Sequence, residues 1–206
     1  MHLIRFDHPL SWGELDLPLL GITHDWEKKP LKSPATYSLA IDPERFWFVA
    51  GHSQPATIHP NARPGQFLAE LWKYDVAEIF IENPATGRYL ELNLAPNGGW
   101  WSAEFTAPRV RAYPEDEPFP GVQTYADLAP DGSWVAAITL PLEPMRERID
   151  FGPNSKANVS FILETPNQRF ITATDLGQKE IDFHWPAAFP TVQIHDGGLP
   201  GSKESS

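Results

Sequence analysis

The sequence predicts an all-β protein: an antiparallel β-sandwich of two packed sheets, immunoglobulin-like or jelly-roll-like, with minimal helix. Twenty-two prolines are spread through the chain of 206 residues. Each removes a backbone donor and fixes φ, so long helices have few places to form. Short runs of residues alternate between apolar and polar with the period of a strand. Turn sequences such as Asp131-Gly132 and Pro166-Asn167 separate these runs.

The alternating runs place the strands in chain order. They cover residues 36–41, 46–50, 76–82, 88–94, 100–105, 133–140, 157–164, 169–174 and 191–194. The one helical segment we expect is Leu142–Ile149, where Glu143 and Pro144 suit a first turn. Residues 52–64 and 109–121 are rich in proline and are expected to be surface loops that could rim a site. Strands this numerous imply two packed sheets.

A single domain accounts for most of the chain. We expect residues 1–196 to form one sandwich and residues 197–206 to be a flexible C-terminal tail, because no repeat or linker divides the sequence. Residues 1–9 lack the pattern of a signal peptide. The expected location is therefore cytoplasmic, or periplasmic or secreted if a leader has been removed.

Charge and composition argue against several classes of function. Lys and Arg total 16 against 27 Asp and Glu, which gives a net charge of −11. Such a surface repels nucleic acids and anionic membranes. No run approaches the roughly 18 apolar residues of a membrane span. The chain has no cysteine, so disulfides, thiolate catalysis and cysteine-ligated metals are excluded.

The segment 76–94 gives the most specific prediction. Its apolar residues fall on one face of a hairpin, and a four-residue loop, 84–87, is needed to keep them together. This register places Glu78 opposite Asn93 and Phe80 opposite Glu91. Glu78, Glu91 and Asn93 then form a polar patch on the other face. An ordinary solvated sheet face is the alternative interpretation.

Two motifs carry a resemblance to a known family. The first is Trp72, Asp75 and Glu78, with a Glu six positions beyond the Trp, followed by the strand Tyr89-Leu90-Glu91-Leu92-Asn93-Leu94 and the Asn97-Gly98 turn. The second is Ile181-Asp182-Phe183-His184-Trp185-Pro186 with Phe189, where an aromatic residue and a proline precede the last strand. Together they resemble the family 9 carbohydrate-binding modules and the DOMON-like superfamily.

The resemblance implies a sandwich that clamps a terminal sugar ring between two Trp side chains. Indoles pack on the C–H face of a pyranose, and carboxylates and amides bind its hydroxyls. The candidate ligand-binding residues are Trp72, Glu78, Glu91, Asn93, Asp182 and Trp185. For each Trp, packing in the core is the alternative. Trp100 and Trp101 are adjacent on a strand, so one of them must point outward as a third clamp candidate.

The sequence assigns no catalytic residue and no metal ligand. Seven histidines show no metal-binding spacing, and His184 is expected to be a hydrogen-bonded structural residue. The resemblance allows structural calcium, but no acidic loop has ligand spacing. Haem binding, as in some DOMON-like relatives, is a less favoured alternative, with Met145 as one available ligand.

The preferred interpretation is a non-catalytic domain that binds a saccharide or a similar small polar ligand. A saccharide-acting enzyme that uses Glu78 and Glu91 is a further alternative, because glycosidases need two nearby carboxylates. The sequence does not determine the ligand or the oligomeric state.

Overall fold

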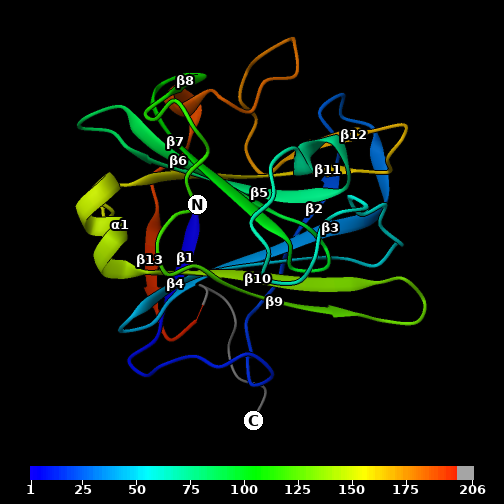
Figure 1. The fold of residues 1–206 in the computed structure, drawn as a ribbon, viewed down its shortest axis with the longest axis horizontal. Coiled ribbons are helices and arrows are strands. Elements are labelled where there is room, and N and C mark those ends of the chain that lie inside the picture. The colour runs from blue at the N-terminus through cyan, green and yellow to red at the C-terminus, as the bar shows by residue number, and fades with distance from the viewer. Residues whose placement is uncertain (199–206) are drawn as a thin grey trace.

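Two sheets packed face to face make up the computed structural model, which describes residues 1–198 (Figure 1). Sheet A has the order β13 (Gln193–Asp196), β1 (His2–Arg5), β3 (Pro30–Ile41), β4 (Arg45–His52), β10 (Trp134–Pro141) and β9 (Gln123–Leu128), with β2 (Leu20–His24) also paired to β3. Sheet B has the order β12 (Arg169–Thr172), β11 (Lys156–Leu163), β5 (Val76–Asn83), β6 (Arg88–Leu94), β7 (Trp100–Ala107) and β8 (Val110–Arg111). The predicted all-β sandwich is confirmed.

The core lies between the sheets and fixes the register of β5 and β6. The apolar positions of this hairpin are all buried there: Ala77, Ile79, Ile81, Leu90, Leu92 and Leu94. Glu78 pairs with Asn93 and Phe80 with Glu91, as predicted. A shift by one residue would turn the apolar side chains out of the core, so burial of the apolar face specifies this pairing.

The one α-helix of the described residues, α1 (Leu142–Ile149), lies at one end of the sandwich (Figure 1). Its bounds are those predicted. Leu142, Met145 and Ile149 point into the core at helical spacing. The helix ends at Ile149, and the capping residue that follows, Asp150, has a positive φ of 48°. Met145 is fully buried among apolar side chains, on a different face of sheet B from the cavity described below.

Four strands of the structure were not predicted: β1, β2, β8 and β9. Each is short, or lies at a sheet edge with few buried positions, so its sequence shows little alternation. β1 runs parallel to both β13 and β3. This pairing joins residues from the two ends of the described chain, and no local pattern could indicate it.

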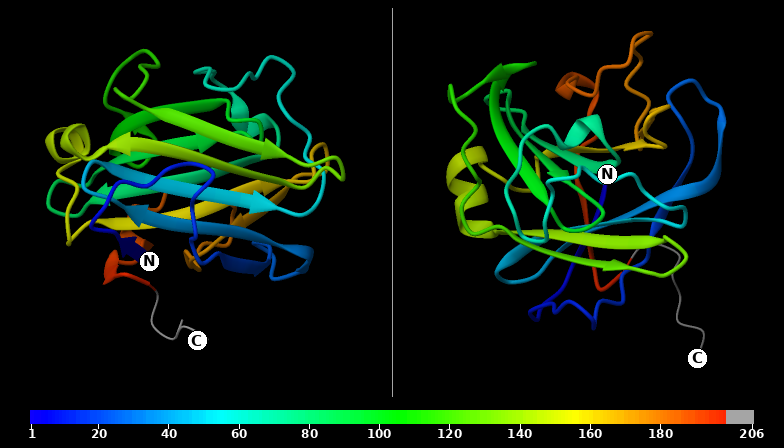
Figure 2. Two further views of the ribbon diagram at one scale, coloured as in Figure 1. Left: turned by 90° about the horizontal axis from the view of Figure 1, so that it is seen from below. Right: turned by 45° about the vertical axis from the view of Figure 1, so that its right-hand side comes forward.

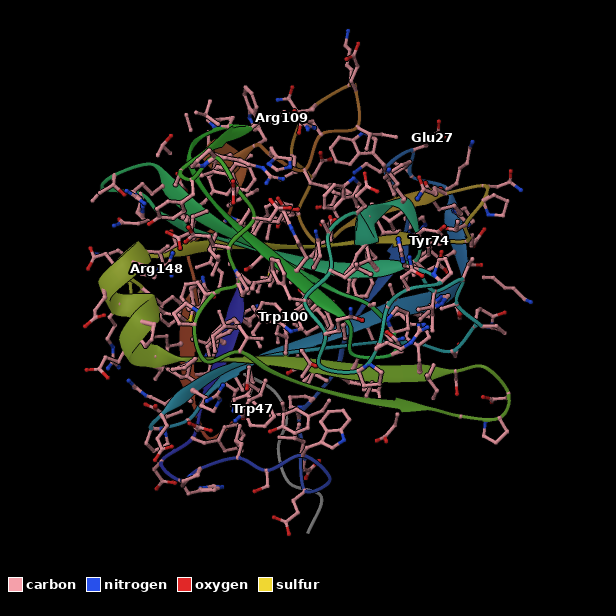
Figure 3. All side chains as sticks on the ribbon, in the orientation of Figure 1. Glu27, Trp47, Tyr74, Trp100, Arg109 and Arg148 are labelled. Atoms are coloured by element: carbon pink, nitrogen blue, oxygen red, sulfur yellow. The ribbon has the colours of Figure 1, made fainter. Side chains whose placement is uncertain are left out.

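The outer face of sheet A is covered by the N-terminal segment. Trp12 stacks on Tyr125, and Tyr125 stacks in turn on Trp47, with ring centroids 5.6 and 5.9 Å apart. Figure 3 shows Trp47 on the side of the molecule opposite Arg109. Because Trp47 is nearly fully buried by this segment, the outer face of sheet A is a second, smaller apolar layer.

The outer face of sheet B, which points away from sheet A, is covered by three segments distant in sequence. They are residues 53–75 with the 3-10 turn η1 (Leu71–Lys73), the β7–β8 hairpin, and residues 173–192 with the turn η2 (Pro186–Ala188). The right-hand view of Figure 2 shows the loop before β13 (orange) and the β7–β8 hairpin (green) rising on the same side of the molecule. The predicted polar patch is therefore buried, and the alternative of a solvated face is wrong.

Two further expectations concern the ends of the chain and the membrane. We expected residues 197–206 to form a flexible tail. Of these, residues 199–206 lie outside the described part of the chain. Within residues 1–198, no helix is long and apolar enough to span a membrane.

Candidate functional site

A cavity of about 350 Å³ lies between the outer face of sheet B and the segments that cover it. This volume is in the range of small-molecule sites. Side chains that point outward from successive strands form its floor: Glu78, Phe80, Glu91, Trp101, Phe105 and Ile162. They share this face because outward positions alternate with core positions along β5, β6, β7 and β11. The floor is thus built on the rigid strands of the sandwich.

Two carboxylates lie side by side on this floor. Glu78 and Glu91 occupy diagonal positions on neighbouring strands, since their direct partners are Asn93 and Phe80. They are 3% and 5% exposed. The Ser160 hydroxyl donates a hydrogen bond of 3.0 Å to Glu78 Oε2, and Asn93 Nδ2 donates one of 3.1 Å to Glu91 Oε1. Both acids are therefore held in fixed orientations.

Neither carboxylate has a cationic partner among the described residues. No Lys or Arg nitrogen in this part of the chain lies within ion-pair distance of either one. Burial raises the pKa of Glu78 to about 7. Burial, followed by repulsion from Glu78, raises the pKa of Glu91 to about 8. The pair therefore retains protons up to near-neutral pH, where ordinary glutamates are ionised.

His184 lies beside the pair as a neutral group. Its Nε2 is 3.6 Å from Glu91 Oε2, and its Nδ1 is 2.8 Å from the Tyr89 hydroxyl. Burial, followed by repulsion from Arg109, lowers the pKa of His184 to about 4. The expectation that His184 is hydrogen-bonded is confirmed, and the residue also lines the cavity.

Two indoles contact each other in the cavity lining. Trp72, from η1, and Trp101, from β7, contact each other edge to face with ring centroids 5.0 Å apart and an interplanar angle of 65°. Trp101 Nε1 donates a 3.0 Å hydrogen bond to Asp116. Trp100 points into the core and packs on Phe67. Of the adjacent tryptophans, Trp101 is therefore the one on the cavity side.

The position of Trp72 depends on a buried aspartate three residues later. Asp75 accepts hydrogen bonds from the backbone N–H groups of Thr57, at 3.1 Å, and Thr165, at 2.9 Å. The Gln168 side chain donates to the Trp72 carbonyl at 3.1 Å. These bonds connect the η1 segment to the turn between β11 and β12, and so hold the Trp72 backbone at the edge of the cavity.

Two arginines at the rim are already paired with acids. Arg109, labelled at the β7–β8 hairpin in Figure 3, lies 2.8 Å from Asp182 on the segment that precedes β13. Arg111 is paired with Asp116, and its guanidinium lies 5.2 Å from the centroid of Trp101. The Arg109–Asp182 pair links two of the covering segments across the cavity rim.

The structure brings together four of the six predicted ligand-binding residues. Trp72, Glu78, Glu91 and Asp182 line the cavity. Asn93 is fully buried and supports Glu91 from beside it, and its Oδ1 has no hydrogen-bond partner among residues 1–198. Trp185 is 40% exposed and lies outside the cavity lining.

Several lining residues were not predicted as ligand contacts. Phe183 and His184 precede Trp185 in an irregular segment, where no periodicity tells which side chain points inward. Arg109 and Arg111 belong to the proline-rich stretch that was expected to rim a site, but no spacing singled them out. Phe105 and Phe170 could have been found from strand alternation alone.

A metal ion would need several acidic or histidine side chains close together. Residues 1–198 contain no group of three or more acidic or histidine side chains arranged to hold a metal ion. The structural calcium allowed by the resemblance therefore has no assigned ligands in this part of the chain.

Comparison with solved structures identifies the fold. A putative carbohydrate-binding protein from Bacteroides uniformis superposes with a TM-score of 0.71 at 14% identity, over 95% of this chain and 98% of that one. A family 9 carbohydrate-binding module (CBM9) from Caldicellulosiruptor kristjanssonii, in complex with glucose, superposes with a TM-score of 0.61 at 12% identity, over 98% of both chains. The chain has a CBM9-like fold. The same CBM9 in complex with cellotriose gives a TM-score of 0.62 at 14% identity, over 100% of this chain and 98% of that one.

Sequence comparison finds shorter similarities. No protein-family model matches the chain. The human UPF0462 protein C4orf33 is 34% identical over 80 residues, or 37% of this chain. The mouse homolog is 46% identical over 39 residues, which is 19% of this chain and 20% of that protein. The match spans 40% of the length of the human relative. The CBM9-like fold is thus established by structure rather than by sequence.

Proposed function

We propose that the chain is a carbohydrate-binding domain and that the cavity on the outer face of sheet B holds a sugar ring. The observation that carries the proposal is the placement of the Trp72 indole beside the buried carboxylates of Glu78 and Glu91 in one cavity. A pyranose needs both kinds of surface: an aromatic ring for its C–H face and fixed acceptors for its hydroxyls.

The polar groups of the cavity suit a ligand with several hydroxyls. Glu78, Glu91 and Asp182 supply acceptors, and a protonated carboxyl of the floor pair supplies a donor. His184 Nε2 is a further polar group on the lining. Because the floor carboxylates are held by Ser160 and Asn93, little side-chain entropy is lost on binding.

The structural neighbours support the same class of ligand. Glucose and cellotriose are bound by the CBM9 structures with which this chain superposes along nearly its whole length. At 12 to 14% identity these neighbours support a saccharide in general and identify no particular sugar.

Tryptophan fluorescence during titration with mono- and disaccharides tests the proposal. We expect a saturable change that disappears in Trp72→Ala and persists in Trp185→Ala, which makes the same substitution at an exposed position outside the cavity. Isothermal titration calorimetry on both variants would separate loss of binding from loss of the fluorescent reporter. If the unmodified protein responds to none of the sugars, the proposal fails.

The paired carboxylates also favour one alternative, a saccharide-acting enzyme. Raised pKa values on two acids in one cavity are typical of acid–base sites as well as of buried binding sites. Hydrolysis of aryl glycosides, abolished by Glu78→Gln while sugar binding is retained, would support this alternative. Absence of hydrolysis together with sugar binding would support the binding domain.

A further inference from the structure

We propose that the cavity selects a sugar that carries a positive charge, namely an amino sugar with a free amine, over the corresponding neutral sugar. The inference rests on the proposed function and specifies its ligand class. Its basis is the arrangement of two buried carboxylates without a counter-ion next to aromatic rings in one cavity.

A cation between the two floor carboxylates would stabilise their ionised forms. Each is more than nine-tenths buried and faces the cavity, and only Ser160 and Asn93 donate side-chain hydrogen bonds to them among the described residues. A desolvated carboxylate without a cation is costly, and two neighbouring ones repel each other. An ammonium group between Glu78 and Glu91 would make charge-assisted hydrogen bonds and offset both costs.

The other titratable groups around the cavity do not supply this cation. Arg109 is paired with Asp182, and Arg111 with Asp116. His184 stays neutral at pH 7 because its pKa is lowered to about 4. Arg109 and Arg111 favour the charged form of Glu91, but each is also paired with its own aspartate, and neither lies within ion-pair distance of the floor carboxylates.

The aromatic lining suits the same cation. Ring faces attract positive charge within about 6 Å of their centroids. Trp101 already carries the Arg111 guanidinium over its ring, 5.2 Å from the centroid, so the indole itself is used in this way within the protein. Trp72, Phe80 and Phe183 also line the cavity. Aromatic faces beside carboxylates favour an ammonium group over a hydroxyl.

A neutral sugar would bind without compensating the negative charge of the floor carboxylates. It offers hydroxyl donors but no charge, so the floor pair must keep a proton or remain uncompensated. A protonated amine can instead displace that proton. Binding of an amino sugar near pH 7 should therefore release a proton, whereas binding of a neutral sugar should not.

The test is isothermal titration calorimetry of the full chain at pH 7 with glucosamine, glucose, N-acetylglucosamine and methylammonium. We expect glucosamine to bind at least about tenfold more tightly than glucose, a difference of about 1.4 kcal/mol. N-acetylglucosamine, whose nitrogen is uncharged, should lose this advantage. Repeating the titration in two buffers with different ionisation enthalpies would detect the released proton.

Glu78→Gln and Glu91→Gln test the origin of the preference. Each keeps an acceptor for its neighbour and removes one charge, so we expect the glucosamine-to-glucose ratio to fall below about threefold. Glu147→Gln, on the exposed face of α1, makes the same charge change and should leave the ratio unaltered. Circular dichroism would verify that each variant is folded.

The outcomes separate this inference from the proposed function. Equal binding of glucose and glucosamine would overturn the charge preference and leave sugar binding intact. Binding of glucosamine and methylammonium without glucose would support a cation site and count against a sugar domain. A preference unchanged by both glutamine variants would overturn the assignment to the floor carboxylates. No binding of any of the four compounds would overturn the charge preference, and the titrations with disaccharides would then decide the proposed function.

Discussion

The indoles of Trp72 and Trp101 meet edge to face with centroids 5.0 Å apart, although one lies in the 3-10 turn η1 and the other on strand β7. Trp101 is 1% exposed and hydrogen-bonded through Nε1, whereas Trp72 is only partly buried. The cavity lining therefore contains Trp101, which belongs to a strand of the sandwich, and Trp72, which belongs to one of the segments that cover sheet B. Replacing Trp101 and Trp72 one at a time should therefore distinguish a loss of stability from a loss of binding.

We expect Trp101→Ala to lower the free energy of unfolding by about 3–5 kcal/mol, the usual cost of emptying a buried Trp site. Trp72→Ala should lower it by about half that or less, because its side chain is less buried. Urea denaturation of both variants measures the difference. Equal losses would show that Trp72 is a core residue and would weaken its role in the ligand site.

The floor carboxylates should make stability depend on pH. Their folded pKa values are raised from the usual 4.5 to about 7 and about 8, so above pH 4.5 the folded state holds protons that the unfolded state has released. The contribution of this pair to the free energy of unfolding should therefore fall as pH rises from about 4.5 to about 8, whereas the lowered pKa of His184 acts in the opposite direction up to about pH 6.5. At pH 8, Glu91→Gln should be more stable than the unmodified protein by roughly 1–3 kcal/mol.

Thermal unfolding between pH 5 and 8 checks this dependence. Burial also raises the pKa values of Glu82 and Glu104 and lowers that of His184, so the informative quantity is the difference in slope between Glu91→Gln and the unmodified chain. Parallel curves for the two proteins would contradict the prediction.

Asp75 should contribute to stability and binding through the same hydrogen bonds. Asp75→Ala leaves the N–H groups of Thr57 and Thr165 without their acceptor, at an expected cost of about 1–3 kcal/mol. Freeing this end of the η1 segment should also weaken sugar binding. Asp75→Asn retains one acceptor oxygen and should show a smaller loss in both denaturation and titration. Full affinity in Asp75→Ala would mean that Trp72 is positioned by other contacts.

Breaking the rim ion pair should affect binding more than stability. Asp182→Asn weakens the link to Arg109, but the pair is partly exposed, so the expected stability loss is below about 1 kcal/mol. Sugar affinity should fall severalfold because the covering segments lose their connection. Asp196→Asn is a matched control, since it disrupts an exposed pair with Arg5 at the edge of sheet A. Similar affinities for the two variants would argue against a role for the rim pair.

The sequence predicted the hairpin from β5 to β6 because a buried apolar face allows one register only. It therefore placed Glu78, Glu91 and Asn93 together on one face. It did not reveal that this face is covered, because the covering segments are irregular and their paths depend on tertiary contacts. Trp185 illustrates the limit: Phe183 and His184 face the cavity, and Trp185 lies outside its lining.

Strand alternation required that Trp100 and Trp101 point to opposite faces, but only the packed sheets show which one is in the core. The short edge strands were missed for a related reason. In β1, two buried residues give no periodicity, and its partners lie about 40 and 190 residues away in the chain.

The parallel pairing of β1 with β13 has a kinetic consequence. His2 to Arg5 are aligned with Gln193 to Asp196, so the contact closes a loop of nearly the whole described chain. Closing such a loop is entropically expensive, and sequence-distant pairings slow folding. We therefore expect this edge to form late in folding, after the central hairpins have condensed. In refolding followed by pulsed hydrogen exchange, the amides of β1 and β13 should gain protection together, and after those of β5 and β6.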